Sequence, residues 1–298
     1  MPWFATTFMQ NVVSCFQPDH TMAEDWTREE VEIIVSEYFD MLSKEQAGIR
    51  FNKSEVRRRI VPLLKGRTES SIEFKNRNIS AVLARMGQPY IRGYIPAYNY
   101  QRQLLEEVVF SYIQRRPEAE AAFRQFAESA PTPKALTFET MLEEMPKLDP
   151  VYQEPELVYN RPVKINYLER EQANQAIGHT GETIALEYER WRLIHAGKAS
   201  LADKIEWVSY TKGDGLGFDI LSKNDNGTDR YIEVKSTKLT KEAPFYFTRL
   251  EYDFSKRTRS SFFLYRVFNL SDKPKLFIAN GAYDEFCNII PTHFKASF

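Results

Sequence analysis

The sequence has 298 residues, of which 43% are hydrophobic and 27% charged, and its formal net charge is −1. This composition excludes a predominantly disordered chain, and no apolar run reaches the roughly 18 residues that a membrane-spanning helix needs. Cys15 and Cys287 are far apart and lack metal-ligand spacing, which argues against a disulfide framework and a zinc site. We therefore expect a cytoplasmic protein without membrane association, long enough for two domains.

The charge is unevenly distributed along the chain. From Arg50 to Arg102, twelve basic residues stand against three acidic ones, whereas from Pro117 to Gln172 six basic residues stand against eleven acidic ones. A local excess of positive charge predicts an anionic partner for that region.

Residues 1–22 lack the basic start and compact apolar centre of a secretory signal, so we expect a weakly ordered extension. Residues 23–116 predict an all-α domain. Thr27 and Glu30 form a capping box before a first helix. Three more helices are expected over about 54–65, with a kink at Pro62, from about 70 to 86, ended by Gly87, and over 98–115.

Residues 117–170 are acidic and rich in proline, which is typical of a linker with short helices. Residues 171–298 predict a second domain, in which a helix around Ile184 and Trp191 precedes a series of apolar runs. We expect strands at 205–210, 217–221, 230–236, 245–247, 261–268 and 275–280, with a helix at 248–256. The predicted fold class is α+β, with a mixed sheet flanked by helices in the C-terminal domain.

Three charged residues lie inside the predicted hairpin of residues 217–237. The Asn226-Gly227 turn can pair its strands antiparallel, so that Asp219 and Glu233 reach one face, and Lys235 lies two residues beyond Glu233 on the same side. Carboxylate oxygens bind divalent metal ions, and a nearby ammonium can stabilise the charge that develops during phosphodiester cleavage. An isolated E-x-K pair on an exposed strand is more commonly a solvated ion pair.

An acidic residue on the preceding helix can complete the set. Glu182 follows Gly181 near the helix start, where the chain can lean over the sheet edge, and Glu187 and Glu189 are alternatives one or two turns further on. Nearby His179 is interpreted as a group behind the site or as part of a surface turn. The histidines form no order typical of covalent catalysis.

The order of these residues resembles the PD-(D/E)XK nuclease core. More closely, GHTGETIALEYERWRL, IEWVSYTKGDGLGFDIL, RYIEVKST and FYFTRLEYDF resemble the domain named after the C-terminus of NO VEIN, over roughly residues 177–268. The resemblance implies an active site of Glu182, Asp219, Glu233 and Lys235, with Mg²⁺ or Mn²⁺ held by the three carboxylates. Thr248 and Glu251 match a second recurrent patch, for which a structural role is expected.

The basic helical region offers candidate DNA contacts. Lys53 and Arg57 belong to its cationic residues, and Tyr94 lies in a tyrosine-rich loop that can stack on bases, although solvated cations and core tyrosines are the alternative. EYFDMLSKEQAGIRFNKSEVRRRIVPLL, SIEFKNRNISAVLARMG and GYIPAYNYQ resemble the head domain of McrA-like HNH restriction endonucleases. That resemblance implies DNA contacts by Lys53, Arg77 and Asn78.

Together these patterns predict a Mg²⁺-dependent DNA endonuclease of the restriction or phage-defence kind. A homodimer is expected, because cleavage of both strands of a duplex needs two active sites. The alternatives are a non-catalytic DNA-binding or regulatory protein that retains the fold, and a nuclease directed at RNA.

Overall fold

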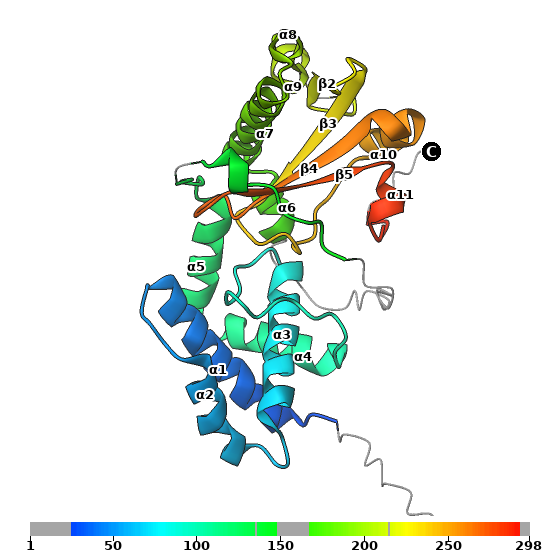
Figure 1. Ribbon diagram of the computed structural model, residues 1–298. Coiled ribbons are helices and arrows are strands. Elements are labelled where there is room, and N and C mark those ends of the chain that lie inside the picture. The colour runs from blue at the N-terminus through cyan, green and yellow to red at the C-terminus, as the bar shows by residue number, and fades with distance from the viewer. Residues whose placement is uncertain (1–24, 135, 148–166, 214, 293–298) are drawn as a thin grey trace, which may run out of the picture.

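The structure, a computed structural model, describes residues 25–134, 136–147, 167–213 and 215–292. The expected extension at 1–22, Cys15 and most of the second half of the expected linker lie outside the described residues. A helical domain and a sheet domain lie one below the other in Figure 1, with α5 and α6 between them. None of the helices in the described ranges is both long and apolar enough to cross a membrane.

The N-terminal domain is a bundle of helices around one hydrophobic cluster. Thr27 caps the first helix in the predicted box with Glu30, and Pro62 ends the second helix in a short 3₁₀ turn, Val61–Leu63. The third helix begins earlier than predicted, because Thr68 rather than Ser70 caps it. The helices are α1 (Arg28–Gln46), α2 (Lys53–Ile60), α3 (Glu69–Arg85), α4 (Arg102–Gln114) and α5 (Pro117–Glu128).

Helix α5 continues the helical domain into the segment expected to be a linker. Phe123 and Ala127 are buried in the same cluster as Phe39 of α1, and the Phe39 and Phe123 rings are 6.2 Å apart. The alternation of small and apolar residues in α5 therefore serves packing, and the hydrophobic core extends past residue 116.

The C-terminal domain is built on a five-stranded mixed sheet in the order β1-β2-β3-β4-β5. Neighbouring strands are antiparallel except β3 and β4, which are parallel because the chain crosses over through α10. The strands are β1 (Glu206–Trp207), β2 (Ile220–Lys223), β3 (Asp229–Ser236), β4 (Phe262–Phe268) and β5 (Lys275–Asn280). The helices are α6 (Tyr167–Gln172), α7 (Gln175–His195), α8 (Ala199–Ala202), α9 (Val208–Lys212), α10 (Arg249–Thr258) and α11 (Tyr283–Phe286).

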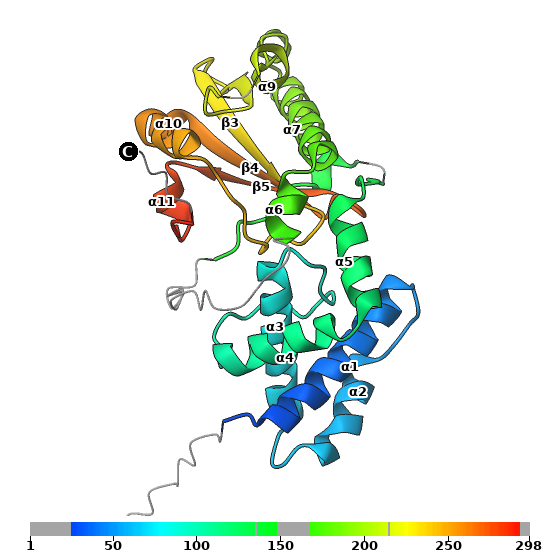
Figure 2. The same cartoon turned by 180° about the vertical axis from the view of Figure 1, so that it is seen from behind.

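Helices cover both faces of the sheet. Ile184 of α7 packs with Ile232 and Val267 on one face, whereas Phe254 of α10 packs with Phe262 on the other. Seen from behind in Figure 2, α7 and α10 lie on opposite sides of β3 and β4. The alternation along β3 therefore points Ile232 and Val234 at α7, and Glu233 and Lys235 toward the side of α10.

Three predicted strands differ from the structure. The strand expected at 217–221 is β2, which begins only at Ile220. The segment 205–210 forms only the two residues of β1 before α9 begins at Val208. The segment 245–247 is not a strand but part of the loop from β3 to α10. Its Phe247 ring stacks on Tyr283 at 4.2 Å, so its apolar character reflects packing against α11 and not strand pairing.

Candidate active site

The site lies where β2 separates from β3. The last regular pair of the two strands is Ile220 with Ile232, and Asp219 directly precedes β2 instead of lying inside it as predicted. Its backbone N–H still donates to the Ile232 carbonyl at 2.9 Å. Its side-chain Oδ2 accepts the next free donor, the Val234 N–H, at 2.8 Å. The Asp219 side chain thus takes the place of the strand partner that β3 lacks beyond Ile232. It is anchored at an open edge of the sheet.

Lys235 lies between two carboxylates. Its Nζ is 2.7 Å from Oε1 of Glu233 and 2.9 Å from Oε2 of Glu251. All three side chains are largely buried, with 11%, 4% and 16% of their surface exposed. The ammonium therefore joins β3 to the first turn of α10.

Glu251 is a site residue for which the sequence predicted a structural role. It has that role, because Thr248 and Glu251 form the capping box of α10, but its carboxylate also contacts Lys235. The box pattern T-x-x-E was visible in the sequence. Its proximity to Lys235 depends on the crossover from β3 to β4, which sequence spacing does not reveal.

Glu182 reaches the site from α7. Its Oε2 accepts hydrogen bonds from the Trp207 indole N–H at 2.6 Å and from the Ser209 hydroxyl at 2.5 Å. The helix can approach because residue 181 is glycine: a Cβ at Gly181 would lie 1.6 Å from Oγ of Ser236 in β3. The close passage of α7 over β3 thus brings the carboxylate of Glu182 to the edge.

A second glycine fixes the other side of the site. Gly217 has φ +87°, and a Cβ there would lie 2.8 Å from Cβ of Phe254 in α10. Only glycine adopts this backbone without strain. The contact holds the segment before Asp219 against α10.

The alternatives to Glu182 point elsewhere. Glu187 is exposed on the outer face of α7. Glu189 is fully buried in a separate network, where it accepts bonds from Arg192 at 2.8 Å and from the Ser222 hydroxyl at 2.6 Å. Of the three glutamates, only Glu182 contributes to the electrostatics of Asp219.

Burial and neighbouring charges shift the pKa values of Asp219, Glu233 and Lys235. Burial, together with the charge of Glu182, raises the pKa of Asp219 to about 7. Burial also raises the pKa of Glu233 well above its usual value, against the opposing effect of Lys235. Burial lowers the pKa of Lys235, but Glu233 and Glu251 outweigh it and the net shift is upward. Lys235 is therefore a permanent cation at neutral pH.

The donor set bears on the metal that the resemblance implies. Within the described ranges, no group of three or more His, Cys, Asp or Glu side chains is arranged to hold a metal ion. Mg²⁺, however, is commonly bound by one or two carboxylates together with water and substrate phosphates. Asp219 and Glu233 are two such oxygen donors, and the charge of Asp219 raises the pKa of Glu233. A bound divalent cation relieves such repulsion, so this pair fits Mg²⁺ or Mn²⁺.

Two of the predicted DNA contacts are buried in the helical domain. Asn78 is 1% exposed and donates to the Ala97 carbonyl at 2.7 Å, and Tyr94 is also 1% exposed. Both hold the loop between α3 and α4 against the bundle. Their side chains are not available to bases in this structure. Asn78 is engaged in a hydrogen bond to the loop backbone, and the Tyr94 ring packs in the hydrophobic core.

The three predicted cationic contacts also have partners within the protein. Lys53 lies over the Tyr94 ring at 4.5 Å. Arg57 pairs with Glu73 at 3.2 Å, and Arg77 donates to the Ile95 carbonyl at 3.0 Å. DNA binding by these residues stays a prediction.

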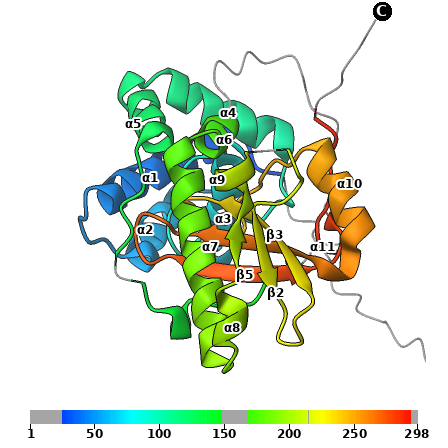
Figure 3. The ribbon, with the colours of Figure 1, turned by 90° about the horizontal axis from the view of Figure 1, so that it is seen from above.

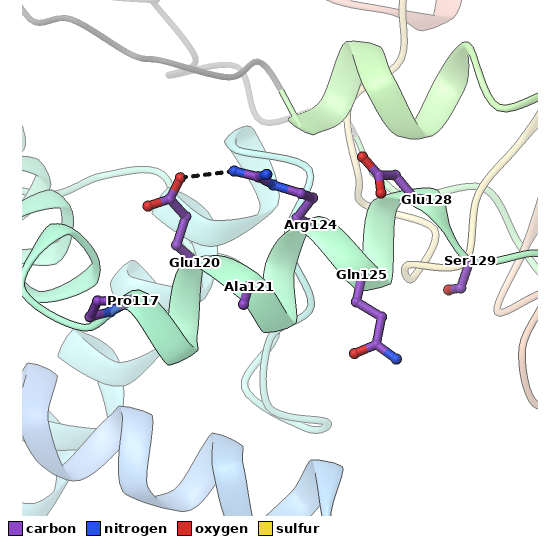
Figure 4. A pocket seen from close by; sticks show the side chains of 7 residues that line it. All are labelled: Pro117, Glu120, Ala121, Arg124, Gln125, Glu128 and Ser129. Carbon is purple, nitrogen blue, oxygen red and sulfur yellow. Dashed lines mark hydrogen bonds and ion pairs between the residues drawn. The ribbon is translucent and has the colours of Figure 1, made fainter.

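An open cleft on α5 lies apart from this site. Figure 4 shows its lining side chains along one face of the helix, among them Glu120 and Arg124, which pair at 3.4 Å. The lining includes none of the carboxylates around Lys235. The cleft is therefore not part of the candidate active site.

Comparison with known proteins supports the sequence resemblance in part. Residues 181–279 match the family described as "Protein NO VEIN, C-terminal", a range that contains Glu182, Asp219, Glu233, Lys235 and Glu251. The chain is 26% identical over 118 residues, or 37% of its length, to "Protein NO VEIN" of Arabidopsis thaliana, of which it spans 4%. No solved structure matches the chain.

Proposed function

We propose that the C-terminal domain is a Mg²⁺-dependent nuclease that hydrolyses phosphodiester bonds of DNA. The supporting observation is that Glu233 and Glu251 contact one buried ammonium at an open sheet edge, while Asp219 beside them interacts electrostatically with Glu182, Lys235 and Glu251. Such an excess of acids costs stability, and strongly perturbed carboxylates are common at functional sites. A purely structural ion pair would need one carboxylate for one lysine.

In this proposal Asp219 and Glu233 would hold the metal ion, which would supply an activated water and stabilisation of charge on the phosphate. Lys235 supplies a second positive charge at the site, beside that of the metal ion. Because its pKa is raised, Lys235 does not serve as a general base at neutral pH. It stabilises negative charge on the phosphate and orients the attacking water.

Glu182 and Glu251 have supporting roles. Two donors, Trp207 and Ser209, already engage one carboxylate oxygen of Glu182. We therefore interpret Glu182 as an anion that shapes the field around Asp219 and not as a principal metal ligand. Glu251 positions Lys235 from α10.

The helical domain contacts the loop that joins the site residues of β3 to α10. Tyr90 bonds to Thr240, and the Tyr98 hydroxyl donates to the Glu242 carbonyl at 3.4 Å. A further contact goes to the loop between β4 and β5, where Arg92 pairs with Asp272 at 3.0 Å. We propose that this domain presents DNA to the site. The restriction or phage-defence role stays a prediction, as does the homodimer, which sedimentation of the protein with and without DNA would test.

The test of the proposed function is cleavage of plasmid and phage DNA by wild type, Lys235→Ala and Lys223→Ala, each with Mg²⁺ and with EDTA. Lys223 lies in the same hairpin but pairs with Asp229 beside the turn, so its variant is the matched control. We expect Mg²⁺-dependent cutting by wild type and Lys223→Ala, and a loss of at least about 100-fold in Lys235→Ala.

Two further measurements make the result decisive: a check that the variant is folded, and a comparison of DNA binding by wild type and variant. Circular dichroism establishes that Lys235→Ala is folded, and Lys235→Met, which retains the aliphatic stem, replaces it if it is not. If wild type leaves every DNA intact and binds it with the same salt-dependent affinity as the variant, the nuclease proposal fails in favour of a DNA-binding protein. Cleavage of structured RNA in preference to DNA contradicts the DNA assignment alone.

A further inference from the structure

Three aromatic side chains gather beside the carboxylates, and we call them the aromatic cluster: His179, Trp207 and Tyr210. The Trp207 ring lies 5.1 Å from His179 and 5.2 Å from Tyr210, between ring centroids. The rings come from α7, β1 and α9. His179 lies on helix α7 and not in a surface turn, which revises the interpretation from the sequence.

The cluster is tied directly to the candidate active site. The Trp207 indole N–H donates to Glu182 at 2.6 Å and to the Ser209 hydroxyl at 2.9 Å. These two bonds fix the plane of the indole ring. The cluster therefore has a defined orientation next to Asp219, whose pKa is sensitive to the Glu182 charge.

The outer ring of the cluster is open to solvent. Tyr210 is 73% exposed, the largest exposed fraction among the large hydrophobic side chains described as exposed, and His179 is exposed as well. A ring in this position buries little surface, so hydrophobic burial gives it little stabilising role. An exposed ring backed by a fixed indole is a surface on which another flat ring can stack.

The surroundings suit a nucleic-acid strand. In the view from above, α7 and α9 lie to one side of β3 and α10 lies to the other (Figure 3). Lys212 ends α9 and Arg249 begins α10, with 55% and 83% of their side chains exposed. Their ion pairs with Glu206 and Asp253 are at the surface, where such pairs contribute little and exchange readily for phosphate.

We propose that the aromatic cluster binds an unpaired nucleobase adjacent to the phosphate that the metal ion and Lys235 would engage, so that the site acts on single-stranded or locally opened DNA. This inference rests on the proposed function and specifies its substrate class. A base within an intact duplex has both faces covered by its neighbours and cannot stack on Tyr210. Stacking is tolerant of sequence, because every base has an aromatic face.

Binding of fluorescein-labelled single-stranded oligonucleotides tests the inference without cleavage. The full chain is titrated in EDTA at constant salt against dT12, against the same backbone carrying abasic sites, and against a duplex of the same length, by fluorescence anisotropy. The variants are Tyr210→Ala and Tyr210→Phe. Ile194→Ala, an exposed apolar position at the far end of α7 with 56% exposure, is the matched control.

We expect Tyr210→Ala to bind dT12 about tenfold more weakly than wild type, and Tyr210→Phe and Ile194→Ala to bind like wild type. The abasic strand should bind wild type as weakly as dT12 binds Tyr210→Ala. Equal binding of dT12 by wild type and Tyr210→Ala, or of dT12 and the abasic strand by wild type, overturns the inference. So does a failure of wild type to bind dT12.

The two proposals fail separately. Cleavage that depends on Lys235, together with unchanged dT12 binding in Tyr210→Ala, removes the stacking site and retains the nuclease. Base-dependent binding through Tyr210 without cleavage by wild type removes the nuclease and retains the stacking site.

Discussion

The two domains arrange their charged residues in opposite ways. In the helical domain each of several cations has its own acid, as in the pairs of Arg67 with Glu30 and Arg59 with Glu37. In the sheet domain two acids, Glu233 and Glu251, share Lys235, and Asp219 interacts electrostatically with the same lysine. Several cations of the basic region are therefore paired one to one with acids in the folded chain, whereas the hairpin of ordinary composition gathers more acids than cations around Lys235.

Glu30 of the helical domain and Asp219 of the sheet domain have pKa values that shift in opposite directions. The hydrogen bond from Arg67 lowers the pKa of Glu30, so the pair stabilises the fold above the unfolded pKa of about 4.3, and that stability is lost as the pH falls through the folded pKa. Burial and Glu182 raise the pKa of Asp219 from 3.8 to about 7. Asp219 therefore costs stability progressively as the pH rises between these two values.

The largest expected effect is on the helical side. Arg67→Ala leaves Glu30 unpaired at a site where both side chains are 10% exposed, and should cost about 3 kcal/mol in free energy of unfolding. Urea denaturation at pH 7 measures it. Arg59→Ala breaks a pair in which the arginine is 59% exposed and should cost less than about 1 kcal/mol. Equal costs would mean that both pairs are surface pairs.

The next largest effect is a difference in stability between alanine substitutions at the two glycines of α7. Gly181→Ala places a Cβ against Ser236 and should cost about 1–3 kcal/mol, with loss of cleavage because Glu182 moves with the helix. Gly178→Ala meets nothing within 4 Å and should stabilise the helix by about 0.5–1 kcal/mol. Thermal melting and the cleavage assay read both. A stabilising Gly181→Ala would contradict the close packing of α7 on β3.

A stabilising substitution is expected at the site itself. Asp219→Asn keeps the acceptor for the Val234 N–H but removes the charge, so in EDTA at pH 8 it should stabilise the protein by about 2 kcal/mol. At pH 5, which lies between the unfolded and the folded pKa of Asp219, the gain should be clearly smaller, and it should disappear only below pH 3.8. Urea titrations at both pH values test the sign. Asp203→Asn, at an exposed position after α8, should leave the free energy of unfolding unchanged at both pH values. An equal gain in this variant would contradict the expected cost of a charged Asp219.

The smallest effect concerns the position of Lys235. Glu251→Gln retains an acceptor for the Thr248 N–H of the capping box. It removes one of the two negative charges that contact the Lys235 ammonium. We expect kcat for DNA cleavage to fall about fivefold, with KM unchanged, because one charged hydrogen bond becomes neutral. Asp253→Asn, two residues away and paired with Arg249, should leave kcat unchanged. A change in KM alone would assign Glu251 to DNA binding.

Much of the fold could be predicted from local patterns. The Thr27 box, the Pro62 break and the Asn226-Gly227 turn depend on backbone chemistry within a few residues, and all three are confirmed. The strand predicted at 245–247 was wrong because apolar residues packed against α11 have the same appearance as a strand. The start of α3 was misplaced because Ser70 and Thr68 are both good capping residues.

The sequence by itself determined the two-part α+β organisation, the hairpin and the residues from which the site is chosen, because periodicity and turn chemistry act over short distances. Tertiary structure alone decided that Glu182 and not Glu189 faces Asp219, that Glu251 contacts Lys235, and that Asn78 and Tyr94 are buried. Each of these depends on the approach of segments distant in sequence. Around Asp219 that approach is made possible at Gly181 and Gly217 by the absence of a Cβ. Charge–charge interactions follow distance in space, so their balance exists only in the folded chain.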